Sequence, residues 1–77
     1  MLTIYSKAAC TYCDQAKALL KNKDIPFTEV RIDLDQTARE FIVSSGYRTV
    51  PQIFDDAYHI GGYTELSQYL QTQLLNA

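Results

Sequence analysis

The order of hydrophobic patterns along this chain leaves few folds open to it. An alternating, β-rich segment at residues 2–6 is followed by a helical pattern over residues 11–23 and by a second alternating segment at 27–33. A helix between two strands is the usual connection between parallel neighbours in one sheet, and such crossovers are right-handed. The first part of the chain therefore predicts two parallel strands joined by a helix.

The middle of the chain predicts a helix and then a hairpin. Residues 35–46 have a helical pattern, which Asp35 can begin as an N-cap and Gly46 can end. Two short β-rich runs follow at 50–54 and 57–62, and the "DD" between them indicates a tight antiparallel turn. These two strands are therefore expected to be antiparallel to each other.

A last helical pattern, residues 64–76, completes the order β-α-β-α-β-β-α. Its apolar stripe consists of Leu66, Tyr69, Leu70 and Leu74. The predicted inner face of the first helix consists of Tyr12, Ala16, Leu19, Leu20 and Lys23. We expect an α/β fold in one domain, residues 1–77, with a four-stranded mixed sheet flanked by three helices.

Charge and hydropathy exclude several functional classes. Seven Lys and Arg stand against nine Asp and Glu, and the basic residues are spread along the chain, which argues against a nucleic-acid binder. No run approaches the roughly 20 apolar residues of a membrane span, and the N-terminal segment has no signal-peptide pattern. We therefore expect no nucleic-acid or membrane partner, a cytoplasmic location and a monomer, since no apolar seam is left over.

Two cysteines, the only ones in the chain, stand as C-x-x-C where the first helix begins. Beside a β-α-β pattern this spacing is typical of a thioredoxin-like redox site. Cys10 precedes the helix, where free N–H groups and the positive end of the helix dipole favour a thiolate, and Lys7 can add positive charge. Cys13 lies one turn further in. We predict that Cys10 attacks and Cys13 resolves.

Two alternatives compete with a redox pair. Free cysteine is among the most buried residue types, so the pair could be structural. The pair could also be half of a metal site, but structural zinc takes four ligands and only His59 could be added. We therefore predict no metal and treat His59 as an ordinary strand residue.

Three separated motifs, "YSKAACTYC", "TVPQIF" and "HIGGYTEL", resemble those of dithiol glutaredoxins in order and spacing. The resemblance implies a thioredoxin fold and glutathione as co-substrate, with no tightly bound cofactor. It implies that Cys10 attacks protein disulfides and glutathione mixed disulfides, and that Cys13 resolves the protein mixed disulfides. The resulting Cys10–Cys13 bridge would then be reduced by two glutathiones.

The resemblance also implies a glutathione site. Pro51 matches a cis-proline that turns the Val50 backbone toward an extended substrate. The γ-glutamyl carboxylate would bind the helix N-terminus at Gly62, Tyr63 and Thr64. The other implied contacts are Lys7, Tyr12 and Thr49, with Arg48 and Gln52 as further candidates for the glycine carboxylate and Glu65 for the α-amino group.

One position departs from the family pattern beside the attacking cysteine. Many glutaredoxins have proline there, and this chain has Thr11, which restores a backbone N–H and adds a hydroxyl. We expect the redox behaviour of Cys10 to differ from that of a proline-containing relative.

Other functions are compatible with the same motifs. A glutaredoxin-like electron donor to ribonucleotide reductase, itself reduced by thioredoxin reductase, shares the fold, but "TVP", "GG" and Lys7 favour glutathione. An iron–sulfur carrier, with Cys10 and glutathione holding a cluster across a dimer, is less favoured because Cys13 competes for Cys10. A non-catalytic binding module is the third alternative. Expected clients are disulfide-containing proteins, ribonucleotide reductase among them, and dehydroascorbate.

Overall fold

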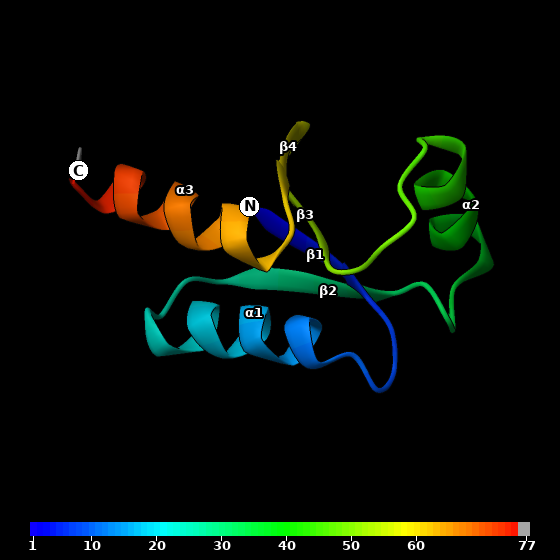
Figure 1. Cartoon of the computed structure of the whole chain (residues 1–77), viewed down its shortest axis with the longest axis horizontal. Helices are drawn as coiled ribbons and strands as arrows, with labels where there is room; N and C mark the ends of the chain where they lie inside the picture. The colour runs from blue at the N-terminus through cyan, green and yellow to red at the C-terminus, as the bar shows by residue number, and fades with distance from the viewer. Residues whose placement is uncertain (76–77) are drawn as a thin grey trace.

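The computed structural model of the protein describes residues 1–75, with side chains as far as residue 72. Helices and strands follow one another in the predicted order (Figure 1). Their bounds are β1 Leu2–Ser6, α1 Thr11–Asn22, β2 Phe27–Arg31, α2 Gln36–Ser44, β3 Gln52–Asp55, β4 Tyr58–Gly61 and α3 Tyr63–Leu75. Of the predicted stripe of the last helix, Leu74 lies outside the described side chains, and Asn76 lies outside the described residues.

The four strands form one mixed sheet in the order β2-β1-β3-β4. β1 is parallel to β2 and antiparallel to β3, and β3 and β4 pair as an antiparallel hairpin. In β1 the side chains of Leu2, Ile4 and Ser6 are buried, and those between them are half-buried. The α/β fold with a four-stranded mixed sheet, and the alternation predicted for the first strand, are confirmed.

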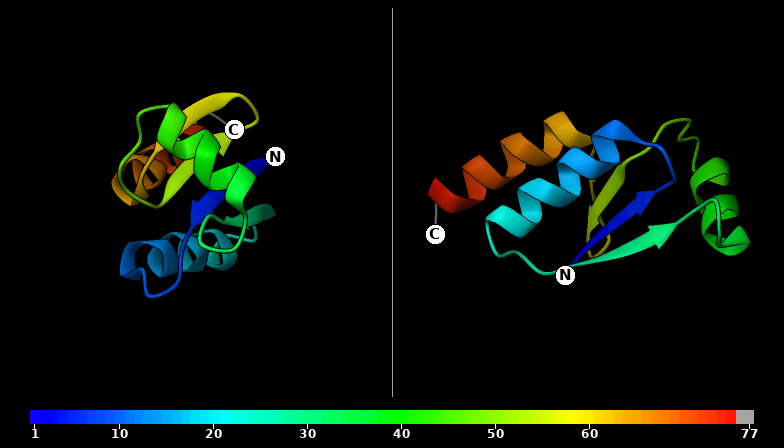
Figure 2. Two further views of the ribbon diagram at one scale, coloured as in Figure 1. Left: turned by 90° about the vertical axis from the view of Figure 1, so that its right-hand side faces the viewer. Right: turned by 90° about the horizontal axis from the view of Figure 1, so that it is seen from below.

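The hydrophobic core lies under α1 and α3, which contact each other and run side by side along one face of the sheet (Figure 2). Ile4 and Ile53 from the sheet meet Leu20 and Leu66 from the two helices, and all four side chains are fully buried. Burying side chains of this kind contributes about 1.5–3 kcal/mol each to folding. This core fixes the position of α1, and with it the position of the cysteines.

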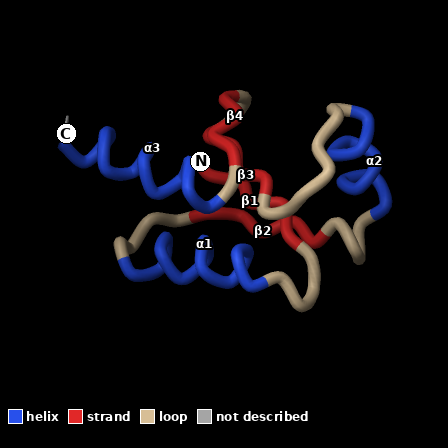
Figure 3. The backbone as a smooth tube through the Cα atoms, viewed as in Figure 1, coloured by secondary structure: helices blue, strands red, loops and turns tan. Residues whose placement is uncertain are grey.

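Helix α2 lies beyond the carboxyl end of β2, at the opposite end of the molecule from the C-terminus of α3 (Figure 1). Its Phe41 ring reaches the other face of the sheet, where the ring centroids of Tyr5 and Phe54 lie 5.6 and 5.9 Å away. These aromatic contacts join α2 to the central strands. The loop after α2 returns from there to β3 (Figure 3).

The two predicted ends of α2 are confirmed. The Asp35 carboxylate accepts a hydrogen bond from the Ala38 N–H at 3.0 Å, as an N-cap does. At the other end Gly46 has a φ of +88°, which glycine adopts without strain. The N–H of Gly46 donates to Val43 O and that of Tyr47 to Ile42 O, so the two bonds close the last turn.

Several details differ from the sequence predictions. The buried residues of α1 are Cys13, Ala16 and Leu20, whereas Tyr12 and Lys23, placed on the inner face by the predicted stripe, are exposed. The face of α1 that is buried against the core is narrower than the predicted stripe.

Within the described residues, no helix is both long and apolar enough to cross a membrane.

The other differences concern the ends of elements. β3 begins at Gln52 rather than at residue 50, β4 spans Tyr58–Gly61 rather than 57–62, and α3 begins at Tyr63 rather than at residue 64. β2 ends at Arg31 rather than at residue 33, because the N–H groups of Leu34 and Asp35 bond back to the Arg31 carbonyl and turn the chain. The hairpin turn lies one residue later than predicted. Asp55 is the last residue of β3, and Asp56, with a φ of +51°, begins the turn.

Candidate redox site at the start of helix α1

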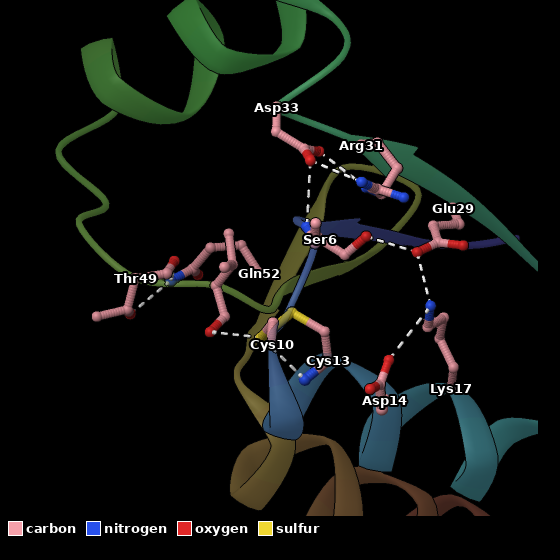
Figure 4. Close-up of a disulfide and its surroundings, with 12 residues drawn as sticks. Ser6, Cys10, Cys13, Asp14, Lys17, Glu29, Arg31, Asp33, Thr49 and Gln52 are labelled. Carbon is pink, nitrogen blue, oxygen red and sulfur yellow. Dashed lines mark hydrogen bonds and ion pairs between the residues drawn. A yellow bond between two sulfur atoms is a disulfide. The ribbon is translucent and has the colours of Figure 1, made fainter.

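Cys10 and Cys13 are joined by a disulfide across the first turn of α1, with 5.2 Å between their Cα atoms (Figure 4). Cys10 is the N-cap residue of α1, and Cys13 points into the protein. The side chain of Cys13 is fully buried, whereas Cys10 keeps 9% of its surface exposed. A disulfide partner arriving from solvent therefore meets Cys10 first.

The sulfur of Cys10 lies between a donor and an acceptor of the main chain. The N–H of Cys13 donates to Cys10 Sγ at 3.1 Å, and the carbonyl oxygen of Val50 lies 3.7 Å from the same sulfur. A backbone N–H at a helix N-terminus stabilises negative charge, so the reduced Cys10 is held where a thiolate is favoured. The carbonyl offers an acceptor to the protonated thiol.

A groove of about 280 Å³ lies beside the disulfide, between the loop before β3, the first turn of α1 and the start of α3. The Val50–Pro51 peptide bond, in the loop wall, is cis. The groove brings together most of the residues implied by the family resemblance. They are Tyr12, Thr49, Val50, Pro51, Gly62, Tyr63, Thr64 and Glu65.

At the far end of the groove, the N-terminus of α3 is closed by its own side chain. The Glu65 carboxylate accepts a hydrogen bond from the Gly62 N–H at 2.8 Å, which satisfies one of the free donors at the helix start. Tyr63 follows Gly62 and lies near Tyr12, with 6.3 Å between ring centroids. Glu65 thus places a carboxylate on the groove and caps the helix at once.

A second pocket, of about 560 Å³, adjoins the groove and shares Thr49 and Val50 with it. We call it the basic pocket, because its charged lining residues are Lys7, Arg39 and Arg48. Lys7 and Arg48 are predicted from the sequence, whereas Arg39 is not. Arg39 lies three and four residues before Ile42 and Val43, which line the same pocket, so it shares their side of α2.

Gln52 lines neither the groove nor the basic pocket. Its side chain is buried, and its amide nitrogen donates to the Thr49 carbonyl at 2.9 Å (Figure 4). Its amide oxygen lies 2.7 Å from Nε2 of His59. The family resemblance implies Gln52 as a candidate for the glycine carboxylate, and His59 is expected to be an ordinary strand residue. The structure places both side chains behind the loop wall.

The glutaredoxin family model matches residues 2–60. Glutaredoxin 3 of Escherichia coli K12 is 52% identical over 64 residues, which cover 82% of this chain and 77% of that protein. The chain belongs to the glutaredoxin family. With its redox-active cysteine pair, it is a thiol–disulfide oxidoreductase.

Solved structures agree with this assignment. Glutaredoxin 1 from Francisella tularensis, complexed with cacodylate, has a TM-score of 0.78 at 36% identity and covers 99% of this chain, which covers 96% of it. A buckwheat glutaredoxin–glutathione complex has a TM-score of 0.78 at 25% identity, with 97% and 73% covered. The glutaredoxin-like NrdH-redoxin from Escherichia coli, at 22% identity, shares the fold with a TM-score of 0.78 and 87% and 91% covered.

A polar network supports the glutaredoxin site from the side opposite the loop (Figure 4). Ser6, fully buried at the end of β1, donates to Glu29 Oε2 at 2.6 Å, and Lys17 of α1 donates to the same oxygen at 2.9 Å. The Ser6 hydroxyl, and then Lys17, lower the pKa of Glu29 against the opposing effect of burial. The sequence alone does not predict this network, because its members are distant from one another along the chain.

Replacement of Glu29 tests the network through its pH dependence. Because the folded pKa of Glu29 is lowered, its contribution is complete above the unfolded pKa and is lost as pH falls through the folded pKa. Glu29→Gln is expected to lower the free energy of unfolding by about 1 kcal/mol at pH 7. Urea denaturation should show this difference shrinking below pH 4. A constant difference down to pH 2.5 would contradict the assignment.

The loop before Cys10 is held to the end of β2 by a hydrogen bond to Asp33, which also forms an ion pair with Arg31. Arg31 bonds Asp33, and the Asp33 carboxylate also accepts the N–H of Ala8 at 3.2 Å. The Arg31 guanidinium, with the Ala8 N–H, lowers the pKa of Asp33 to about 2. Asp33 therefore stays charged over the working pH range and holds the turn that leads into Cys10.

No group of three or more His, Cys, Asp or Glu side chains is arranged to hold a metal ion among the described residues.

Proposed function

We propose that this glutaredoxin is a glutathione-dependent oxidoreductase in which Cys10 is the nucleophile and Cys13 the resolving thiol. The observation that carries the proposal is the position of Cys10. It is the N-cap of α1, the more exposed of the two cysteines, and its Sγ lies 3.7 Å from the backbone carbonyl of Val50, which lines the groove. A tripeptide disulfide in that groove would present its sulfur to Cys10.

Both ends of the groove suit glutathione chemically. One end is the N-terminus of α3, whose dipole favours a carboxylate such as that of the γ-glutamyl unit, and the Glu65 carboxylate, which also lines the groove, would pair with its α-amino group. The other end opens through Thr49 and Val50 into the basic pocket, which offers cations to the glycine carboxylate. The buckwheat glutaredoxin solved as a glutathione complex shares this fold.

For a glutathione mixed disulfide, the reaction needs one cysteine of the protein. The Cys10 thiolate attacks the glutathione sulfur, a Cys10–glutathione disulfide forms, and the client thiolate leaves and takes a proton. A second glutathione, as its thiolate, attacks the bound glutathione sulfur. Oxidised glutathione leaves and the Cys10 thiolate is restored.

For a protein disulfide, both cysteines are needed. Cys10 attacks one client sulfur, and the other client sulfur leaves as a thiol. Cys13 then attacks the Cys10 sulfur, which releases the second client thiol and forms the Cys10–Cys13 disulfide. A first glutathione opens this disulfide at Cys10, and a second removes the first as oxidised glutathione. Two electrons pass from two glutathiones to one client disulfide.

The main alternative function is that of an electron donor to ribonucleotide reductase, in which thioredoxin reductase reduces this protein. The identity of the reductant distinguishes the two functions. NrdH-redoxin, a glutaredoxin-like protein with a thioredoxin-like activity profile, shares the fold of this chain, and this likeness is the reason to test the alternative. We expect glutathione with glutathione reductase to reduce the Cys10–Cys13 disulfide at least about tenfold faster than thioredoxin reductase with the same NADPH. The NADPH absorbance measures both rates. The opposite order would overturn glutathione dependence.

We further propose that the protein acts as a cytoplasmic monomer on disulfide-containing proteins, with ribonucleotide reductase as one client to test. An iron–sulfur carrier is less favoured because Cys13 lies within disulfide reach of Cys10, so that the disulfide competes with cluster ligation.

A further inference from the structure

The loop at residues 47–50 forms one wall of the redox site without belonging to a helix or strand. Thr49 and Val50 line both the groove and the basic pocket, and the Val50 carbonyl lies 3.7 Å from Cys10 Sγ. A small displacement of this loop would change the groove and the surroundings of the sulfur together. The contacts that hold the loop therefore matter for substrate binding.

Gln52 holds the loop from behind. Its side chain is 7% exposed, and its amide nitrogen donates to the Thr49 carbonyl at 2.9 Å. Its amide oxygen lies 2.7 Å from His59 Nε2. An amide oxygen only accepts hydrogen bonds, so Nε2 of His59 must carry the proton. The chain of donors thus runs from His59 to Gln52 and from Gln52 to Thr49.

The His59 ring is fixed in place by two aromatic rings. It stacks on Tyr47 with 4.4 Å between centroids and an interplanar angle of 25°, and the Phe54 centroid lies 4.9 Å away. Tyr47 is the first residue of the loop. His59 therefore reaches the loop twice, at one end through its ring and near the other end through Gln52 and Thr49.

We propose that His59 is a positioning residue of the redox site, which acts through Gln52 to hold the Thr49–Val50 backbone opposite Cys10. It lines neither the groove nor the basic pocket and takes no part in the chemistry. Insofar as glutathione is the ligand, this inference rests on the proposed function. Its other consequence, the state of the His59 ring and the loop, can be measured without a substrate.

Two substitutions at His59 separate the hydrogen bond from the ring. His59→Phe keeps an aromatic ring for Tyr47 and Phe54 but removes the donor, whereas His59→Gln supplies an amide N–H at a similar reach. We expect His59→Phe to raise KM for a glutathione mixed disulfide about fivefold to tenfold, with kcat within about twofold. His59→Gln should restore KM to within about twofold of the wild type. An unchanged KM in His59→Phe would overturn the proposal.

Gln52→Glu tests the second link of the same chain. A glutamate still accepts from His59, but its carboxylate cannot donate to the Thr49 carbonyl. We expect the same rise in KM as in His59→Phe, and no further rise when the two substitutions are combined, because both break one chain. Multiplied effects in the double variant would contradict the chain.

A matched control excludes general destabilisation as the cause. Tyr69→Phe removes a hydrogen bond of 2.6 Å that α3 donates to Asp55 at the end of β3, away from the groove. It should lower the midpoint of thermal unfolding and leave KM unchanged. A KM raised as much as in His59→Phe would mean that lost stability explains both, and would overturn the positioning role.

Nitrogen-15 spectra of the imidazole test the inference without glutathione. In neutral His59 we expect a protonated Nε2 and an unprotonated Nδ1, and the amide signals of Thr49 and Val50 should shift in His59→Phe but not in His59→Gln. A protonated Nδ1 would overturn the inference. If the spectra are as expected but wild-type protein fails to use glutathione, the proposed function fails while the positioning of the loop stands.

Discussion

Cys10→Ser is expected to reduce the turnover of a glutathione mixed disulfide by at least about a thousandfold, since a serine hydroxyl is not ionised near pH 7 and forms no disulfide. Cys13→Ser should keep this activity within about tenfold of the wild type, because Cys13 is not needed when glutathione itself is exchanged. On a protein disulfide, both variants should lose turnover. The coupled oxidation of NADPH through glutathione reductase measures each rate.

The fully buried position of Cys13 calls for a control on folding. Far-ultraviolet circular dichroism and thermal unfolding should show both serine variants folded at the assay temperature. If folded Cys10→Ser and Cys13→Ser lost the mixed-disulfide activity equally, the roles assigned to the two cysteines would be wrong. Retention of activity in Cys10→Ser with loss in Cys13→Ser would reverse them.

The sequence was most informative where local chemistry decides the structure. Strand β1 follows from strict alternation, and α2 follows from a capping aspartate, Asp35, and a glycine, Gly46, that can turn the chain. The cysteine pair at the start of α1 follows from its spacing beside a β-α-β unit. In each case the residues that fix the feature lie within a few positions of it.

Features made by distant residues could not be derived in the same way. The pair of Glu29 with Ser6 depends on strand register, since β1 and β2 pair in parallel with Glu29 opposite Ile4, two positions before Ser6. The contact of His59 with Gln52 depends on the hairpin register and on the side-chain rotamers. Neither leaves a local pattern, and a lone histidine in a strand looks ordinary.

The inner face of α1 shows a third reason for error. Helical periodicity places Tyr12 and Ala16 on the same face as Leu20, but only the width of the covered arc decides which of them is buried. The packing of α1 against β1 and α3 covers Cys13, Ala16 and Leu20, and leaves Tyr12 61% exposed at the groove. The exposed Tyr12 ring lies at the groove and is not part of the core.

Gly61→Ala is expected to be the most damaging glycine substitution at the site. Gly61 has a φ of +128°, which residues with a side chain rarely adopt, and a Cβ there would lie 2.8 Å from Glu65 Cγ. Glu65 would have to move away, and its carboxylate would lose the hydrogen bond that it accepts from the Gly62 N–H. We expect a loss of about 2–4 kcal/mol in the free energy of unfolding, measured by urea denaturation.

Two comparisons separate the backbone strain of Gly61→Ala from the clash. Gly46→Ala also requires a positive φ, +88°, but its Cβ would meet nothing within 4 Å, so it should cost only about 1 kcal/mol. In Gly61→Ala with Glu65→Ala, the contacts of the new Cβ with Glu65 Cγ and Oε1 are removed, whereas its contact with the Cβ of residue 65, 2.9 Å away, and the backbone strain remain. The combined loss should therefore be smaller than the sum of the two single losses by about 1 kcal/mol. Additive losses would mean that the outer part of the Glu65 side chain yields freely, so that its Cγ and carboxylate are not what reserves this position for glycine.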